Sequence, residues 1–265
     1  MTTIQTLEKD LQQIRSKKPL IHNITNFVVM NNTANALLAI GASPVMAHAH
    51  NEVDEMVKIA SALVINIGTL DDVWLKAMIR AGEAANATKT PIIFDPVGAG
   101  ATSYRIKACQ DIINTCHPEI IRGNASEIIA VSGSNSSTKG VDSTTSSDSA
   151  LDAAIKLADQ TKSIVVISGG TDYITDGKTV KKVYNGHPMM EKMTGMGCTA
   201  TAIVAAFAAV NPDYLTAAEE GMIVMGITGE MVAEKSSGNG SLQMNFLDGL
   251  YNLDIDQIKN YYRNK

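Results

Sequence analysis

Short apolar runs alternate with amphipathic helical segments along much of the 265-residue chain, and this alternation limits the possible folds more than any other feature. Five runs are nearly continuous in branched apolar residues, as strands buried on both faces are. They span residues 20–24, 62–68, 91–98, 119–124 and 163–170. Helix-like segments lie between them, at 31–40, 52–60, 71–87, 103–115 and 148–161. Repeated strand–helix units predict an α/β fold with a central, mostly parallel sheet and helices on both faces.

The pattern changes after Gly170. Asp176 and Gly177 lie between two β-rich runs, which is a common signal for a tight hairpin. The rest of the chain is mostly helical, with segments at 197–210, 216–236, 240–253 and from 256 onward. Residues 132–149 are low in complexity, and we interpret them as a polar surface loop because the strand–helix pattern continues on both sides. We therefore expect residues 1–265 to form a single domain.

Composition and charge exclude several classes of protein. A net charge of −5 and the lack of a dense Lys/Arg run give no reason to expect a nucleic-acid partner. The longest uncharged apolar stretch, 198–210, is shorter than the roughly 20 residues of a membrane span, and no secretory signal is visible. Three cysteines cannot all pair, and none belongs to a CxxC pair. These features predict a soluble cytoplasmic protein with no membrane partner and no zinc site.

Polar and glycine residues follow the predicted strands where each apolar run stops. They are Asn23, Asn26, Asn66, Gly68, Asp95, Gly98, residues 122–127 and residues 168–170. Loops are polar in general, which explains part of this pattern. In an open parallel sheet, however, ligands bind at the carboxyl ends of the strands. The sequence therefore predicts one site at that edge of the sheet.

Two of these segments carry residues suited to phosphate and magnesium. Asp95 is well placed to act on Mg²⁺ through water, or it caps a loop. The guanidinium of Arg122 can bind a phosphate through bidentate hydrogen bonds. Asn124 and Glu127 are three residues apart at the start of a predicted helix, which fits a capping box as well as a binding site. Spacing alone leaves both interpretations open.

The segment Thr194–Gly195–Met196–Gly197–Cys198 opens a predicted apolar helix. A helix N-terminus attracts anions, and glycines let the backbone approach them and adopt positive φ, which we expect at Gly197. The alternative is a glycine-rich turn with a buried structural cysteine. The commoner nucleotide and hydrolase motifs are absent: there is no GxxxxGK[ST] loop, no GxGxxG after the first run and no GxSxG elbow.

The N-x-x-E pair and the late G-x-G-C loop resemble those of ribokinase-like kinases of small alcohols. Four segments narrow the resemblance to the hydroxyethylthiazole kinase family: residues 22–47, 95–105, 122–128 and 194–202. This resemblance implies one ribokinase-like domain that uses ATP and Mg²⁺ to phosphorylate 4-methyl-5-(2-hydroxyethyl)thiazole in thiamine salvage. It also implies a homotrimer with the thiazole pocket between neighbouring subunits. The alternatives are a kinase of another small alcohol, such as a hydroxymethylpyrimidine, and a nucleotide-sensing trimer without turnover.

The resemblance also implies a role for individual residues. Those expected at the thiazole are Met46, Gly195, Asn26 and Gly68. Those expected at ATP are Arg122, Ser168 and Asn124, and those expected to organise Mg²⁺ are Asp95 and Glu127. The N–H groups of residues 195–198 are expected to stabilise the phosphoryl group in transfer, with Gly197 and Cys198 as catalytic residues. Relatives often place an aspartate base where this chain has Cys198, so we expect the thiol to contribute only modestly. Met196 replaces a smaller residue, which changes little if the loop acts through its backbone.

Overall fold

The computed structural model describes residues 3–133 and 147–263, and its centre is one sheet of eight strands. The strand order is β2-β1-β3-β4-β5-β6-β7-β8. The strands are β1 (Leu20–Ile24), β2 (Ser43–Val45), β3 (Ala62–Asn66), β4 (Ile92–Asp95), β5 (Ile120–Asn124), β6 (Ile164–Ser168), β7 (Asp172–Thr175) and β8 (Val180–Val183). Strands β1 to β6 run parallel to one another, whereas β7 is antiparallel to both of its neighbours, β6 and β8. The predicted mostly parallel sheet and the hairpin at Asp176–Gly177 are confirmed.

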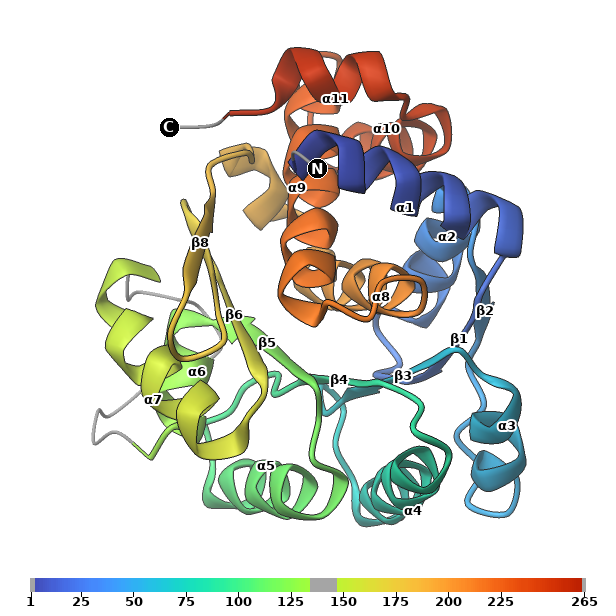
Figure 1. Cartoon of the computed structure of the whole chain (residues 1–265), viewed down its shortest axis with the longest axis vertical. Coiled ribbons are helices and arrows are strands. Elements are labelled where there is room, and N and C mark those ends of the chain that lie inside the picture. The colour runs from blue at the N-terminus through green and yellow to red at the C-terminus, as the bar shows by residue number, and fades with distance from the viewer. Residues whose placement is uncertain (1–2, 134–146, 264–265) are drawn as a thin grey trace.

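Helices cover both faces of this sheet. They are α1 (Thr3–Lys17), α2 (Met30–Ile40), α3 (Val53–Ile59), α4 (Asp72–Thr88), α5 (Ser103–Cys116), α6 (Ala125–Val131), α7 (Leu151–Thr161), α8 (Met196–Ala208), α9 (Tyr214–Ala233), α10 (Asn239–Asn252) and α11 (Ile255–Tyr261). Two 3₁₀ turns, Ser147–Ala150 and Pro188–Lys192, complete the described elements. Figure 1 shows α4 and α5 against one face of the sheet and α8 and α9 against the other. No helix among the described residues is long and apolar enough to span a membrane.

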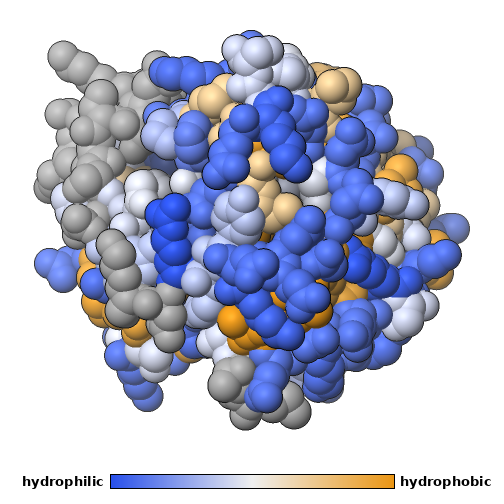
Figure 2. Space-filling view, turned by 90° about the horizontal axis from the view of Figure 1, so that it is seen from above, coloured by the Kyte–Doolittle hydropathy of each residue, from blue (hydrophilic) through white to orange (hydrophobic). Residues whose placement is uncertain are grey.

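Each face of the sheet has its own apolar core. Side chains of alternating strand residues, such as Val64 and Ile93, pack with α1, α2 and α8 to α11. Their neighbours on the strands, such as Ile65 and Phe94, pack with α3 to α7. Helix α8 is buried along its whole length after its first turn, which explains its composition of small and apolar residues. The outer surface seen in Figure 2 is largely hydrophilic, as expected for helices that turn their apolar sides inward.

Two elements were not predicted from the sequence. The edge strand β2 has only three residues, and its central residue is Pro44, which cannot donate a ladder hydrogen bond. Such a strand is too short to show a periodic pattern. The turn Pro188–Lys192 likewise shows no periodic pattern of apolar residues. Most of the predicted surface loop at 132–149 lies outside the described residues.

Candidate active site

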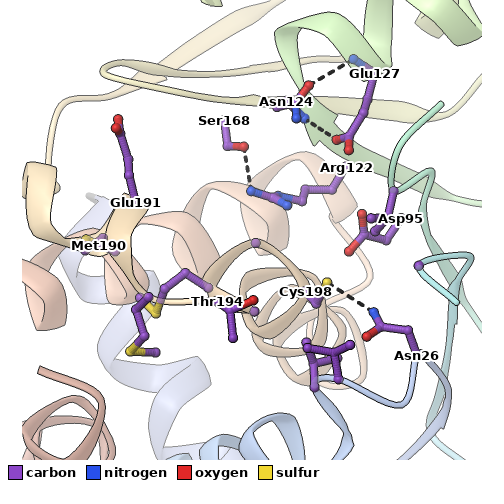
Figure 3. Close-up of a pocket in the computed structure, with 18 of the residues that line it drawn as sticks. Asn26, Asp95, Arg122, Asn124, Glu127, Ser168, Met190, Glu191, Thr194 and Cys198 are labelled. Atoms are coloured by element: carbon purple, nitrogen blue, oxygen red, sulfur yellow. Dashed lines mark hydrogen bonds between the residues drawn. The ribbon is translucent and has the colours of Figure 1, made fainter. Parts of the chain in front are cut away.

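A cavity of about 490 Å³ opens at the carboxyl ends of the parallel strands. It lies beside the point where the chain reverses direction along the sheet, between β1 and β3, which is where open α/β sheets bind ligands. Ten of the eleven predicted site residues line this cavity: Asn26, Gly68, Asp95, Arg122, Asn124, Glu127, Ser168, Gly195, Gly197 and Cys198. The predicted gathering of strand-end residues into one site is therefore confirmed (Figure 3).

The N-terminus of α8 forms one wall of the cavity. Gly195 is its N-cap and adopts the left-handed region with φ of +84°, and a Cβ there would lie 2.7 Å from Cγ1 of Val29. The first main-chain bond of the helix runs from the Thr199 N–H to the Gly195 carbonyl over 2.8 Å. The N–H groups of Met196, Gly197 and Cys198 come before that bond, so the helix offers them no carbonyl acceptor. With the positive end of the helix dipole behind them, these free donors are suited to binding an anion.

The positive φ predicted at Gly197 is wrong. Gly197 lies within the first turn of α8, and the positive φ belongs to Gly195 instead. A Cβ at Gly197 would lie only 2.7 Å from Nη1 of Arg122, which is too close for real atoms. A side chain at position 197 would therefore force the Arg122 guanidinium to move, whereas glycine lets the helix backbone and the guanidinium lie side by side at the cavity.

Arg122, on β5, lines the cavity with its side chain directed toward Ser168 (Figure 3), and it is only 7% exposed. Its Nη2 donates a short hydrogen bond to the hydroxyl of Ser168 at the end of β6. Its Nε is buried and has no protein acceptor. A buried guanidinium with a free N–H is costly unless a ligand accepts from it, and phosphate oxygens match its geometry.

Asp95, at the end of β4, presents one occupied and one free oxygen. Its Oδ2 accepts hydrogen bonds from Nδ2 of Asn66 (2.7 Å) and from the hydroxyl of Thr201 (2.9 Å), whereas Oδ1 is buried without a partner. Burial raises the pKa of Asp95 to about 6, against the opposing effect of the Arg122 charge. A carboxylate oxygen without a partner, facing a cationic guanidinium, fits a hard cation such as Mg²⁺.

Glu127 and Asn124 form the capping box that their spacing allowed. The Asn124 side chain accepts from the Glu127 N–H (2.9 Å), and Oε2 of Glu127 accepts from the Asn124 N–H (2.8 Å). Oε1 of Glu127 accepts from the Gly98 N–H (2.8 Å), which ties the loop after β4 to the start of α6. Both carboxylate oxygens are thus engaged by backbone, so Glu127 reaches a metal ion more readily through water than directly.

Cys198 lines the cavity as a neutral thiol. Burial raises its pKa to about 12, with a further contribution from the charge of Asp95. Its Sγ accepts a 3.5 Å hydrogen bond from Nδ2 of Asn26 (Figure 3). The helix N-terminus alone would lower this pKa, but burial outweighs it. The expectation that Cys198 is not a thiolate base agrees with this environment.

The opposite end of the cavity is less polar. Asn26 packs directly on Gly68, where a Cβ would lie 2.5 Å from the Asn26 amide nitrogen. Val28, Val29, Met190, Met193 and Met196 supply the apolar part of the cavity lining, beside the polar residues Thr69, Glu191 and Thr194. Met46, the eleventh predicted residue, does not line this cavity, because it follows the edge strand β2 and lies beyond β1.

The described part of the chain holds no preformed metal cage. Among residues 3–133 and 147–263, no group of three or more histidine, cysteine, aspartate or glutamate side chains can hold a metal ion. Mg²⁺ commonly keeps several waters and uses one or two carboxylates together with substrate phosphates. The free oxygen of Asp95 fits that mode of binding.

Four residues that support the site have no predicted role. Asn66 and Thr201 orient Asp95. Arg105 donates to the carbonyls of Ile67, Val97 and Gly68, and so joins the loops after β3 and β4. Asp172, whose pKa burial raises to about 7, accepts from the Gly169 N–H and holds the turn after Ser168. Asn66 is among the polar strand-end residues, and Arg105 and Thr201 lie in segments that carry the family resemblance, but no role was predicted for any of the three.

Comparison with known proteins agrees with this geometry. Residues 11–256 match the Hydroxyethylthiazole kinase family. The hydroxyethylthiazole kinase of Desulfotalea psychrophila is 52% identical over 254 residues, covering 96% of this chain and 93% of the relative. The solved structure of a hydroxyethylthiazole kinase protein from Pyrococcus horikoshii OT3 is 39% identical, with a TM-score of 0.90 and 98% coverage of both chains. The fold is shared with a ribokinase-like superfamily protein from Enterococcus faecalis, which is 15% identical with a TM-score of 0.67. The match covers 94% of this chain and 89% of the E. faecalis chain. The chain therefore belongs to the hydroxyethylthiazole kinase family.

Proposed function

We propose that this protein transfers the γ-phosphoryl group of ATP to the hydroxyl of 4-methyl-5-(2-hydroxyethyl)thiazole, a step of thiamine salvage. One observation carries the proposal: the open N–H groups of α8, the buried Arg122 and the free oxygen of Asp95 converge on one cavity. Such a set of donors and one carboxylate suits phosphoryl transfer, in which catalysis depends mainly on positioning and on charge stabilisation.

Arg122, Ser168 and Asn124 form the proposed binding site for ATP. They come from the ends of the adjacent strands β5 and β6. Arg122 would donate to phosphate oxygens, and Ser168 would hold the guanidinium in place through the short hydrogen bond. Asn124 stays oriented by its capping role at α6.

The proposed metal is Mg²⁺, with Asp95 as its main protein contact and Glu127 acting through water. Mg²⁺, when bound, would neutralise charge on the phosphates of ATP. Asp95 would present Oδ1, since Oδ2 is held by Asn66 and Thr201. Glu127 would hold the Gly98 loop beside the phosphates through its hydrogen bond to the Gly98 N–H.

The first turn of α8 would stabilise the phosphoryl group during transfer. The N–H groups of Met196, Gly197 and Cys198 point to where charge accumulates on the equatorial oxygens. The Cys198 thiol, with its raised pKa, would line the site beside the attacking hydroxyl rather than deprotonate it. Gly197 would let the backbone and Arg122 contact the same group.

The thiazole would bind at the less polar end, against Asn26, Gly68 and Gly195. Met46 lies away from this cavity, so its proposed contact with the thiazole requires a second subunit. Exposed apolar side chains support such a neighbour: Phe27 and Val28 after β1, and Leu38 on α2, are 62%, 63% and 58% exposed. A homotrimer with shared sites is therefore part of the proposal.

Two wider statements complete the proposal. Residues 1–265 form one domain, which is supported by the single eight-stranded sheet. The protein works in the cytoplasm, which is supported by three free cysteines, none of them in a disulfide.

A coupled assay of ADP release tests the proposed activity. The purified protein is given Mg·ATP with the thiazole alcohol, a hydroxymethylpyrimidine, a sugar alcohol or no acceptor. We expect ADP release that depends on the thiazole alcohol. Turnover of the pyrimidine but not of the thiazole contradicts the proposed substrate, and ATP binding without turnover of any alcohol supports a nucleotide sensor instead.

A further inference from the structure

Asn66 does not line the cavity, yet it lies at the centre of the hydrogen bonds that organise it. It is the last residue of β3 and is 1% exposed. The register of the sheet pairs it with Asp95 of β4. Because side chains alternate along a strand, both residues share the face of the sheet that α8 covers, as Val64 and Ile93 do.

The amide of Asn66 has one orientation that satisfies all of its neighbours. Its Nδ2 donates to Oδ2 of Asp95 (2.7 Å). Its Oδ1 accepts from Nδ2 of Asn26 (2.8 Å) and from the Gly68 N–H (3.0 Å). The reverse orientation would place an amide oxygen against a carboxylate and an NH₂ group against two donors. The amide is therefore locked, and it links residues at the two ends of the cavity.

This link determines what each partner offers to a ligand. Asn66 and Thr201 together occupy Oδ2 of Asp95, so Oδ1 is the oxygen left for the phosphate end of the cavity. Asn26, held by Asn66, also donates to Sγ of Cys198 over 3.5 Å. The chain of hydrogen bonds thus runs from the α8 thiol through Asn26 and Asn66 to the Asp95 carboxylate.

We propose that Asn66 is a positioning residue, which holds the Asp95 carboxylate and the Asn26 amide in register for phosphoryl transfer. This inference rests on the proposed function, because it assigns Asp95 to the phosphates and Asn26 to the acceptor alcohol. Displacement of a reacting group by about 1 Å can lower a rate by roughly 10²-fold. A residue that sets the angle of Asp95 therefore controls kcat without touching either substrate.

The variant Asn66→Asp tests the donor half of this role. It keeps the size of the side chain and the oxygen that accepts from Asn26 and Gly68, but it replaces the donor to Asp95 with a second carboxylate. We expect kcat to fall by about 10²-fold while the KM of the thiazole alcohol changes less than about threefold, since the Asn26 contact survives. Thr201→Val, which removes only the other donor to Asp95, is the matched control and should lower kcat in the same direction without changing that KM.

A double-mutant cycle separates positioning from a general structural effect. In the Asp95→Asn background, Asn66→Asp should change kcat less than about threefold, because no carboxylate remains to be oriented. An equal loss of kcat in both backgrounds, or wild-type kcat for Asn66→Asp, overturns the proposal. If Asn66→Asp does not fold, as judged by its melting curve, Asn66→Ser enters the same cycle, with the same expected and contradicting results.

The wild-type assay separates this inference from the proposed function. If the wild type phosphorylates a different alcohol, the proposed substrate is wrong, and the cycle is run with the alcohol that it accepts. If the wild type turns over no alcohol, both the proposed function and the positioning role are overturned. If the wild type phosphorylates the thiazole alcohol but the effects of Asn66→Asp and Asp95→Asn on kcat are additive, only the positioning role of Asn66 is overturned.

Discussion

The two ends of the cavity are built in different ways. At the phosphate end, Asp95, Arg122 and Glu127 each make hydrogen bonds to named side chains or backbone groups of the same subunit. The surface proposed to bind the alcohol is less highly connected: it offers the amide of Asn26, glycines, and the valines and methionines of the cavity lining. The residue at Met46, predicted to contact the thiazole, lies outside the cavity altogether.

This difference follows from the chemistry of the two proposed ligands. A triphosphate carries charge, so its site needs donors and a carboxylate that are fixed before binding. A small aromatic alcohol is bound mainly through apolar contact and shape, which flexible methionines and a neighbouring subunit can supply. We therefore expect changes at the phosphate end to affect turnover most, and changes at the alcohol end to depend on assembly.

Arg122→Ala should have the largest effect, because it removes the only buried cation described at the phosphate end. An arginine that stabilises phosphoryl transfer contributes about 10³–10⁵-fold in kcat, so we expect kcat/KM for ATP to fall by at least about 10³-fold. Arg80→Ala is the matched control, because Arg80 pairs with Asp54 outside the cavity. Activity of Arg122→Ala within tenfold of the control would show that the guanidinium does not contact the phosphates.

Gly197→Val should have the next largest effect. Its Cβ would collide with Nη1 of Arg122 and would push the α8 backbone away from the phosphoryl group. Loss of one such backbone donor costs about 10²–10³-fold in kcat, measured with the thiazole alcohol. Gly240→Val is the control, because Gly240 is the second residue of α10 as Gly197 is of α8, and a Cβ there meets no atom within 4 Å. Equal kcat values for the two variants would contradict the proposed role of the α8 backbone.

Cys198→Ala and Cys198→Asp should have the smallest effects. General-base help is typically worth about 10²–10⁴-fold, and a neutral thiol should contribute at or below the bottom of that range. Because its raised pKa of about 12 keeps Cys198 protonated across pH 6–9, Cys198→Ala should retain the wild-type pH profile. Cys198→Asp introduces a carboxylate that can act as a base, and it should retain or raise activity. An inactive Cys198→Asp beside a nearly normal Gly197→Val would assign the chemistry to the thiol instead.

The sequence was sufficient to predict most of the fold. The periodicity of apolar residues predicted five parallel strands and the helices between them. The residues preferred in tight turns predicted the hairpin at Asp176–Gly177. The edge strand β2 was not predicted, because three residues around Pro44 carry no periodic pattern. Strand order was not predicted either, since β1 lies between β2 and β3 through packing that no local pattern encodes.

The sequence located the site but not its internal geometry. Strand-end residues such as Asn26, Asp95 and Arg122 were predicted to gather, because parallel strands end at one edge. The positive φ predicted at Gly197 was wrong, and no local pattern indicated that this backbone lies against Arg122, 75 positions away in the chain. The hydrogen bonds of Asn66 could not be predicted from the local sequence either, because they depend on the register between β3 and β4.

A subunit-mixing experiment tests most directly the claim that one end of the site is complete and the other is shared. Arg122→Ala disables the phosphate end, and Met46→Arg disables the proposed contribution of the neighbour. Each variant alone should be nearly inactive on the thiazole alcohol. Co-expressed at equal amounts as trimers, they should recover about a quarter of the wild-type kcat, because random mixing places an intact phosphate end beside an intact Met46 at that fraction of interfaces. A mixture as inactive as either variant alone would contradict the account, because it would mean that each subunit holds its whole site.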